Sequence, residues 1–249
     1  PNLSCETFND GVKLSTGRRA SALVQIYSCC LTVASDRFGR DDARVPSLVP
    51  PAMAAGSLCR SPQPSVPVGT TAVLRAWQLS DAEAVVQAFF GDPEIQRWHV
   101  RRFDSVNEAQ HWITGCNAGW AEESELNWAL VDRASDSLMG RVSLKSVKLH
   151  DGSADVAYWM VPAWRGRGYC SQAVIALCQW AFTDAGFHRL GLEHSVANVA
   201  SCRVATKAGF HAEGIRQEAA LHADGWHDMH EHALLAHHLP DTWAVSQTW

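Results

Sequence analysis

Hydrophobic and polar residues follow regular periods only from about Thr70 onward. Alternation with period two is typical of strands, and spacings of three and four residues are typical of amphipathic helices. The pattern predicts strands at 71–77, 127–132, 138–147, 154–161, 189–196, 210–217 and 226–235. It predicts helices that begin near Ser80, Ser105, Ser171 and Asn198. This order predicts an α+β fold, with a mixed, mostly antiparallel central sheet, flanking helices and one parallel βαβ step at its middle.

A short turn rich in arginine and glycine follows the predicted strand 154–161. Gly166 and Gly168 let the backbone approach a ligand closely, while Arg165 and Arg167 add positive charge. A helix begins directly afterwards, and the N–H groups of its first turn have no partners inside the helix. The turn therefore predicts a site for a phosphate or pyrophosphate group.

The composition argues against several classes of protein. The net charge of −5 and a charged fraction of 19% give no overall basic field, so we expect no nucleic-acid partner. No apolar run is long enough to form a transmembrane helix, so we expect no membrane association. The eight cysteines are scattered without a CxxC pair, which favours reduced thiols and a cytoplasmic location over a disulfide framework.

The first 67 residues differ from the rest, because they keep no hydrophobic period and six of the ten prolines lie between residues 46 and 67. Such a stretch is typical of a disordered extension with a Pro-rich linker. The alternative is that the residues before Met53 are translated upstream sequence, with Met53 as the true start. We therefore expect an extension at 1–67, one domain at 68–238 and a tail at 239–249.

Several spaced motifs together resemble one enzyme family. Arg165, Gly168 and Cys170 match the fingerprint [Q/R]-x-x-G-x-[G/A] of the GNAT acyl-CoA N-acetyltransferases, with Cys170 as a departure from Gly or Ala. Further stretches resemble the ribosomal-protein-alanine acetyltransferase branch of this family: 158–162, 198–204, 207–210, 213–214 and 224–228. The resemblance covers roughly residues 68–238.

The resemblance implies a GNAT-type sheet with splayed middle strands and acetyl-CoA as the acetyl donor. The pyrophosphate is expected on the turn, and the pantetheine arm is expected along the preceding strand and near Asn198. The residues expected to bind acetyl-CoA are Met160, Val161, Arg165, Gly166, Arg167, Gly168, Tyr169, Cys170, Ser171, Asn198 and Ser201.

The resemblance also implies a carboxylate that takes the proton of the attacking amine, with Glu193 as first candidate and Asp155 as second. An ion pair or a solvated strand position explains either carboxylate equally well. Ala205 stands where many members carry a tyrosine general acid, so we do not expect a simple acid–base pair. The residues expected to contact the amine acceptor are Trp98, Arg101, Trp226 and His227.

Seven histidines crowd the C-terminal part of the chain, and His230 and His232 share one face of a predicted strand. No cysteine or carboxylate accompanies them at a recognised spacing, so we expect no metal ion. We expect an acetyl-CoA-dependent N-acetyltransferase, monomeric or homodimeric, whose acceptor is a protein or peptide N-terminus. A small-molecule amine is the alternative acceptor, and a catalytically silent acyl-CoA binding module is the alternative from another class.

Overall fold

The computed structural model describes residues 48–238, which form one compact unit from Pro50 onward. The extension predicted for residues 1–47 and the tail predicted for 239–249 lie outside the described residues. Within the described chain, no helix is long and apolar enough to cross a membrane.

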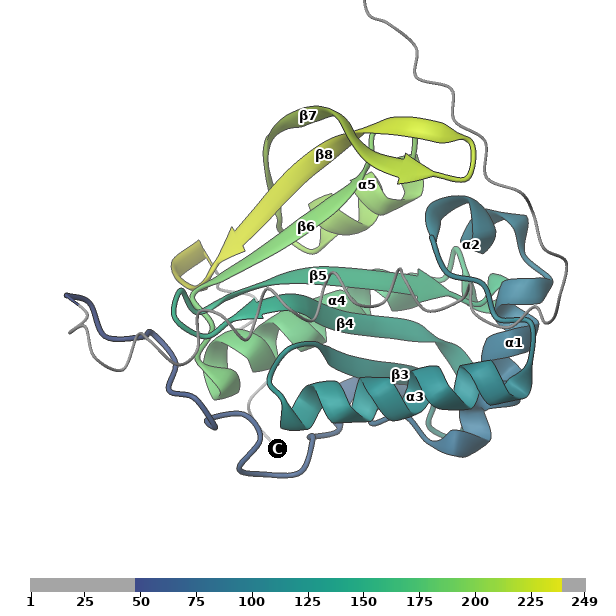
Figure 1. Ribbon diagram of the computed structural model, residues 1–249, viewed down its shortest axis with the longest axis horizontal. Coiled ribbons are helices and arrows are strands. Elements are labelled where there is room, and N and C mark those ends of the chain that lie inside the picture. The colour runs from purple at the N-terminus through teal and green to yellow at the C-terminus, as the bar shows by residue number, and fades with distance from the viewer. Residues whose placement is uncertain (1–47, 239–249) are drawn as a thin grey trace, which may run out of the picture. The chain divides into compact units, whose positions relative to one another are not determined.

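Eight strands form a single sheet in the order β1-β2-β3-β4-β5-β6-β8-β7 (Figure 1). All neighbouring strands are antiparallel except β5 and β6, which are parallel. The predicted fold class is therefore confirmed, and all seven predicted strands are present. The strands are β1 (Val66–Val68), β2 (Ala72–Arg75), β3 (Leu126–Asp132), β4 (Leu138–Lys148), β5 (Ser153–Met160), β6 (Arg189–Ser195), β7 (His211–His222) and β8 (Gly225–Leu235).

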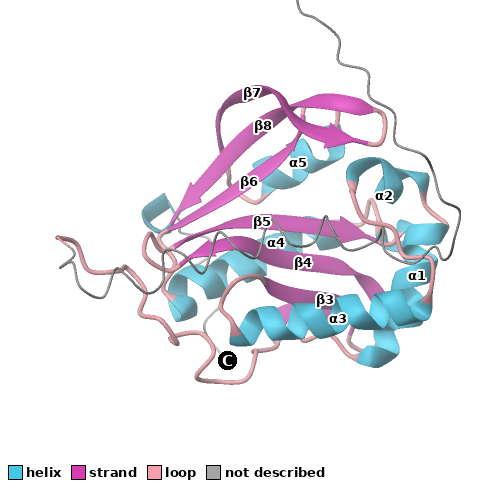
Figure 2. Cartoon of the chain, viewed as in Figure 1, coloured by secondary structure: helices cyan, strands magenta, loops and turns pink. Residues whose placement is uncertain are grey.

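Helices cover both faces of the sheet (Figure 2). The four predicted helices are present, and an additional short helix, α2, occupies a stretch that the pattern predicts only as a turn. The helices are α1 (Ala82–Phe90), α2 (Pro93–Trp98), α3 (Val106–Ala121), α4 (Tyr169–Trp180) and α5 (Val199–Lys207). The predicted N-cap of α3 is confirmed, since the Ser105 hydroxyl accepts a hydrogen bond from the Glu108 N–H at 3.3 Å.

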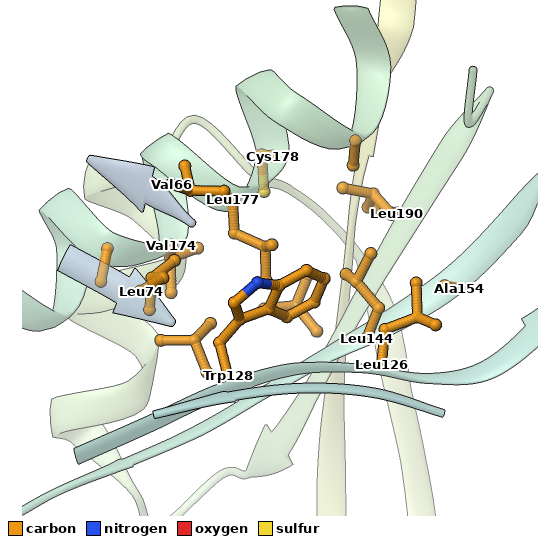
Figure 3. Packing of buried hydrophobic residues seen from close by; sticks show 14 of the residues in the cluster. Val66, Leu74, Leu126, Trp128, Leu144, Ala154, Val174, Leu177, Cys178 and Leu190 are labelled. Carbon is orange, nitrogen blue, oxygen red and sulfur yellow. The ribbon is translucent and has the colours of Figure 1, made fainter. Parts of the chain in front are cut away.

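Strand β3 contributes side chains to two hydrophobic cores, because its side chains alternate between the two faces of the sheet. Trp128 is fully buried beside Val174 and Leu177 of α4, as Figure 3 shows. Ala129 and Val131 instead join the core formed with α1 and α3. Burial on both faces explains why every residue but the last of β3 is buried, and it fixes the register of the central strands.

The segment 50–67 packs against the domain, which differs from the extended linker expected there. The buried carboxylate of Glu123 accepts hydrogen bonds from the N–H groups of Gly56, Leu58 and Cys59. Tertiary hydrogen bonds and burial of Met53 (4% exposed) therefore order a proline-rich stretch that has no period of its own. Indole N–H groups hold it further along, with Trp120 donating to the Ser61 carbonyl at 3.0 Å and Trp128 to the Pro64 carbonyl at 2.9 Å.

Candidate active site

The two parallel strands at the middle of the sheet separate toward their C-terminal ends. Their pairing runs from Ser153 and Arg189 to Val156 and Leu192, and no pairing between these two strands continues beyond that point. A cavity of about 490 Å³ lies next to the unpaired end of β5. It is bordered by the glycine turn, the end of β5, the first turns of α5, and α2 with the residue after it.

Most residues expected to bind acetyl-CoA come together at this cavity. Val161 and Arg167 do not border it. Those that border it are Met160, Arg165, Gly166, Gly168, Tyr169, Cys170, Ser171, Asn198 and Ser201, with Tyr169 and Cys170 in the first turn of α4.

The glycine turn has a left-handed backbone conformation that residues other than glycine rarely adopt. Gly166 has φ of +75° and Gly168, the N-cap of α4, has φ of +84°. A Cβ at Gly166 would meet no atom within 4 Å, so the space beside the turn is open. The Ser171 hydroxyl donates to the Gly168 carbonyl at 3.0 Å and holds the turn against the helix. An anion placed here would face the N–H groups of the first turn of α4.

Arg165 fixes the turn to its surroundings. Its guanidinium pairs with the buried carboxylate of Asp92, and its Nε donates to the Met160 carbonyl at 3.0 Å. Arg167 lies over the Trp164 ring at 5.6 Å from the ring centre. Arg165 is therefore largely engaged by the protein, and the backbone rather than this guanidinium is placed to meet an anion.

The end of β5 offers one backbone edge to the gap between the strands. Val161 has both backbone groups bonded within the protein, because its N–H donates to Met139 at 2.8 Å and its carbonyl accepts from Trp164. Backbone groups alternate between the two edges of a strand, so the Met160 N–H points to the edge away from β4. Met160 therefore fits the expected contact with a pantetheine arm, and Val161 does not.

Asn198 and Ser201 lie at the start of α5, on the opposite side of the gap. The side-chain oxygen of Asn198 accepts from the Ser201 N–H at 3.0 Å, which is an N-cap, and its amide N–H groups remain available as donors. The Tyr158 hydroxyl donates to the Ser201 carbonyl at 3.2 Å. Burial raises the pKa of Tyr158, so this phenol stays protonated at neutral pH.

Cys170 borders the cavity as a protonated thiol. Burial raises its pKa to about 12, so the helix N-terminus does not activate it as a nucleophile. Its role in the turn is that of a small residue, which agrees with its position in the fingerprint.

Neither carboxylate expected as the base borders the cavity. Glu193 pairs with Arg216, which also contacts Glu231 at 2.7 Å between Nε and Oε1. Asp155 is exposed, and its carboxylate lies above Gly191 on the neighbouring strand. Glu193 is therefore engaged in an ion pair, and Asp155 is a solvent-exposed strand residue, as in the alternatives to a catalytic role given above.

The residues expected at the acceptor site divide into those near the cavity and those away from it. Trp98 borders the cavity, and the His227 ring contacts the Trp98 indole at 5.8 Å between centres. The His227 ring nitrogens lie 2.7 Å from the Ser195 hydroxyl and 2.8 Å from the Asp224 carboxylate. Arg101 borders a separate cavity of about 140 Å³, and Trp226 is 63% exposed and outside both.

One carboxylate at the cavity escapes the sequence analysis. Glu94 is the only carboxylate among the residues that border it, and its Oε2 accepts from the Trp98 indole at 3.2 Å. His99 also borders it, and burial, with a smaller effect of Arg141, lowers the His99 pKa to about 4. Helical spacing brings Glu94 and Trp98 together, but the six-residue α2 is too short to show a period.

Comparison with known proteins identifies the class. Residues 72–211 match the family described as "Acetyltransferase (GNAT) domain", and the chain belongs to this family. The predicted family and enzyme class are confirmed: the chain is an acetyl-CoA-dependent N-acetyltransferase.

Among curated proteins, the Bacillus subtilis "Probable N-acetyltransferase YjcK" is 31% identical over 178 residues, covering 70% of this chain and 97% of the relative. The Escherichia coli "Ribosomal-protein-serine acetyltransferase" is 29% identical over 100 residues, covering 40% of this chain and 56% of the relative. The expected similarity to ribosomal-protein acetyltransferases is therefore confirmed at the level of homologues.

Solved structures show the same fold. The ribosomal L7/L12 alpha-N-protein acetyltransferase RimL in complex with coenzyme A superposes with a TM-score of 0.65 at 22% identity, covering 69% of this chain and 98% of that one. The ribosomal-protein-S5-alanine acetyltransferase from Vibrio fischeri superposes with a TM-score of 0.64 at 18% identity, covering 73% and 99%. The open turn at Gly166 and the Met160 N–H on the edge away from β4 fit an acyl-CoA with a pyrophosphate and an extended arm.

Proposed function

We propose that this enzyme acetylates the N-terminal α-amine of a protein or peptide. The observation that carries the proposal is the position of Glu94 on the same cavity as the glycine turn and Asn198. An α-amine has a pKa of about 8 and is mostly an ammonium ion at neutral pH, so a carboxylate at the cavity would attract it. The named activity of RimL, on the N-terminus of a ribosomal protein, supports the same class of acceptor.

Several groups of the chain would orient the donor. We propose that the N–H groups of the first turn of α4 hold the pyrophosphate, and that the Asn198 amide and the Met160 backbone hold the extended arm. Holding both reactants in one orientation replaces a bimolecular encounter and supplies much of the rate enhancement. Acetyl-CoA supplies a thioester whose thiolate is a good leaving group, so a strong general acid is not required.

Glu94 is our proposed proton acceptor, in place of Glu193 and Asp155. The amine forms the new C–N bond only after its ammonium loses a proton, and Glu94 would take this proton directly or through water. As the tetrahedral intermediate collapses, the C–S bond breaks and the thiolate leaves with the electron pair. The second proton of the amine nitrogen passes to this thiolate or to solvent, which leaves the neutral amide. Burial lowers the pKa of His99 to about 4, so this ring is neutral at pH 7 and, unlike a carboxylate, carries no charge that attracts the ammonium.

A panel of acceptors tests the proposal. Peptides that begin with Ser or Ala are compared with amino sugars and polyamines at a fixed acetyl-CoA concentration, and free thiol and product mass are recorded. The matched control is each peptide with its N-terminus already acetylated and an internal lysine kept. We expect transfer to the free N-terminus and none to the blocked peptide. Preferred transfer to a small amine or to the lysine would reject the α-amine acceptor.

A further inference from the structure

A cluster of potential metal ligands lies between α5 and the strand pair β6–β8. The ligand atoms of its four side chains all lie within 4.8 Å of one another, and two of the side chains are buried. Two strands and one helix contribute to it, and β8 comes from a later part of the chain than the consecutive elements β6 and α5. The members of this His–Cys cluster are His194 on β6, Cys202 on α5, and His230 and His232 on β8.

The sheet register explains why these side chains meet. His194 pairs directly with His230 across the two strands, and His232 lies on the same face two residues further along β8. Cys202 comes from α5. This helix packs near the same face of β6, since its Ala205 belongs to the same hydrophobic core as Leu192, which lies two residues before His194. The sequence analysis saw His230 and His232 on one face, but the partners from β6 and α5 are non-local.

The hydrogen bonds of His194 define which of its nitrogens faces the cluster. Its Nδ1 lies 2.8 Å from the Ser195 carbonyl, which can only accept, so Nδ1 carries the proton. The lone pair of a neutral ring is then at Nε2, which lies 3.1 Å from Nε2 of His232. This is the arrangement of a metal-binding histidine whose other nitrogen is fixed by a backbone carbonyl.

The second buried histidine of the cluster has no hydrogen bond that fixes its tautomer. Nδ1 of His232 is buried without a hydrogen-bond partner among residues 48–238, so either nitrogen of this ring can carry the proton, and Nε2 can present its lone pair to the cluster. The ordinary pKa of histidine is about 6.5, so an imidazole is mostly neutral near pH 7. Neutral imidazole is the form that binds a metal ion.

We propose that the His–Cys cluster binds one Zn²⁺ ion in a tetrahedral site with three nitrogen ligands and one sulfur ligand. Zinc prefers four-coordinate sites of histidine nitrogen and cysteine sulfur. With Zn–N bonds of about 2.0–2.1 Å, two nitrogens of a tetrahedral site lie about 3.3 Å apart, close to the 3.1 Å between His194 and His232. Binding converts the Cys202 thiol to a thiolate and releases its proton to solvent.

The site would be structural, because four protein ligands leave no open position for water or substrate. It would join α5 to the sheet at Cys202, the residue after Ser201, which borders the acetyl-CoA cavity. Zn²⁺ would therefore stabilise the helix that presents Asn198 and Ser201 to the cavity.

Cobalt(II) substitution tests the site in the full chain, prepared without a histidine tag and stripped with a chelator. We expect one equivalent of Co²⁺ to bind, with a thiolate-to-metal charge-transfer band and the intense visible bands of tetrahedral cobalt. Cys202→Ser should abolish the charge-transfer band and weaken binding by more than about 100-fold, since loss of an outer partner alone costs 10- to 100-fold. The matched control is Cys59→Ser, which changes an exposed cysteine outside the cluster.

Two further measurements keep the test decisive. Zn²⁺ should raise the melting temperature and slow amide hydrogen exchange across 199–207 in the unmodified chain and in Cys59→Ser, but not in Cys202→Ser. Circular dichroism checks that Cys202→Ser folds. His230→Asn provides a second, half-buried substitution that should weaken Co²⁺ binding while any complex that forms keeps the charge-transfer band of Cys202. Uptake well below one equivalent, or a charge-transfer band that survives Cys202→Ser, would overturn the proposal.

Discussion

The carboxylate of Asp92 connects α2 with the glycine turn. One oxygen accepts from the Glu94 N–H at 3.1 Å and caps α2, while the other pairs with Arg165. Asp92 is 6% exposed, so the pair is shielded from solvent on its side. This one residue therefore holds the helix that carries Glu94 and the turn that faces the proposed pyrophosphate.

Asp92→Asn separates these two roles, because asparagine still caps a helix but carries no charge. We expect a loss of about 1–2 kcal/mol in the free energy of unfolding and a higher KM for acetyl-CoA, since Arg165 loses its charged partner. Chemical denaturation and steady-state kinetics measure both. Asp104→Asn is the control, because it breaks the exposed pair with Arg102 and should leave the free energy of unfolding nearly unchanged. Equal effects of the two substitutions would contradict a connecting role.

Gly168→Ala should weaken acetyl-CoA binding, because it places a Cβ in the proposed cradle and strains a residue with φ of +84°. Gly186→Ala is a matched control at the far end of the same helical segment, where φ is +86° and a Cβ would meet no atom within 4 Å. We expect both to lose about 1–2 kcal/mol of stability from the backbone strain. Only Gly168→Ala should raise the KM for acetyl-CoA, by about 10-fold. A similar KM in both variants would place the donor elsewhere.

Asn198 can be tested for a role beyond its helix cap. Serine is also a good N-cap, so Asn198→Ser should keep the stability, whereas Asn198→Ala should lose about 1 kcal/mol. If the amide holds the donor, both variants should bind acetyl-CoA about 10-fold more weakly. Isothermal titration with acetyl-CoA and thermal unfolding give the two numbers. Normal binding by Asn198→Ser would leave Asn198 as a cap alone.

Glu94→Gln should lower kcat by about 100-fold or more and flatten the rising limb of the pH–rate profile. Glutamine keeps an acceptor for the Trp98 indole, so the local structure should be preserved. Glu193→Gln is the comparison, and we expect less than a two-fold change because Glu193 is paired with Arg216 away from the cavity. The opposite ranking of the two variants would restore Glu193 as the base.

Cys170→Ala should leave kcat at pH 7 within about two-fold, because a thiol with a pKa of about 12 is not a nucleophile there. It should also change the pH dependence of stability. The unfolded thiol ionises near pH 8.5 and the folded one does not, so its stabilisation is complete below pH 8.5 and declines as the pH rises toward 12. Between pH 9 and 10 the unmodified chain should lose about 1.2 kcal/mol more stability than Cys170→Ala. A parallel pH dependence would contradict the burial of this thiol.

Local patterns were sufficient to predict most of the fold. The alternation in 127–132 and 138–147, the Ser105 cap and the glycine turn each depend on neighbours in sequence, and the structure has all of them. The residues expected to bind acetyl-CoA could be assigned because the family resemblance shows which motifs, distant in sequence, meet in the fold. Hydrophobic periodicity alone does not show this.

Predictions that depend on tertiary contacts were less complete. The position of Glu193 on β6 follows from sequence, but its pairing with Arg216 of β7 depends on how the last three strands pack. Glu94 lies on a helix too short to show a period. The His–Cys cluster needs three elements in register, and no spacing along the chain reveals it.

The contacts of Glu123 also define how far the folding unit extends beyond the family pattern. The match to the family begins at residue 72, whereas Glu123 accepts its hydrogen bonds from residues 56–59. A chain shortened to begin at residue 68 would bury this carboxylate and the indole N–H groups of Trp120 and Trp128 without these partners. Unsatisfied buried groups are costly, so such a fragment should aggregate or express poorly although it keeps every catalytic motif. For expression and for transplanting the domain, the smallest usable piece is set by these hydrogen bonds and includes residues from about 50.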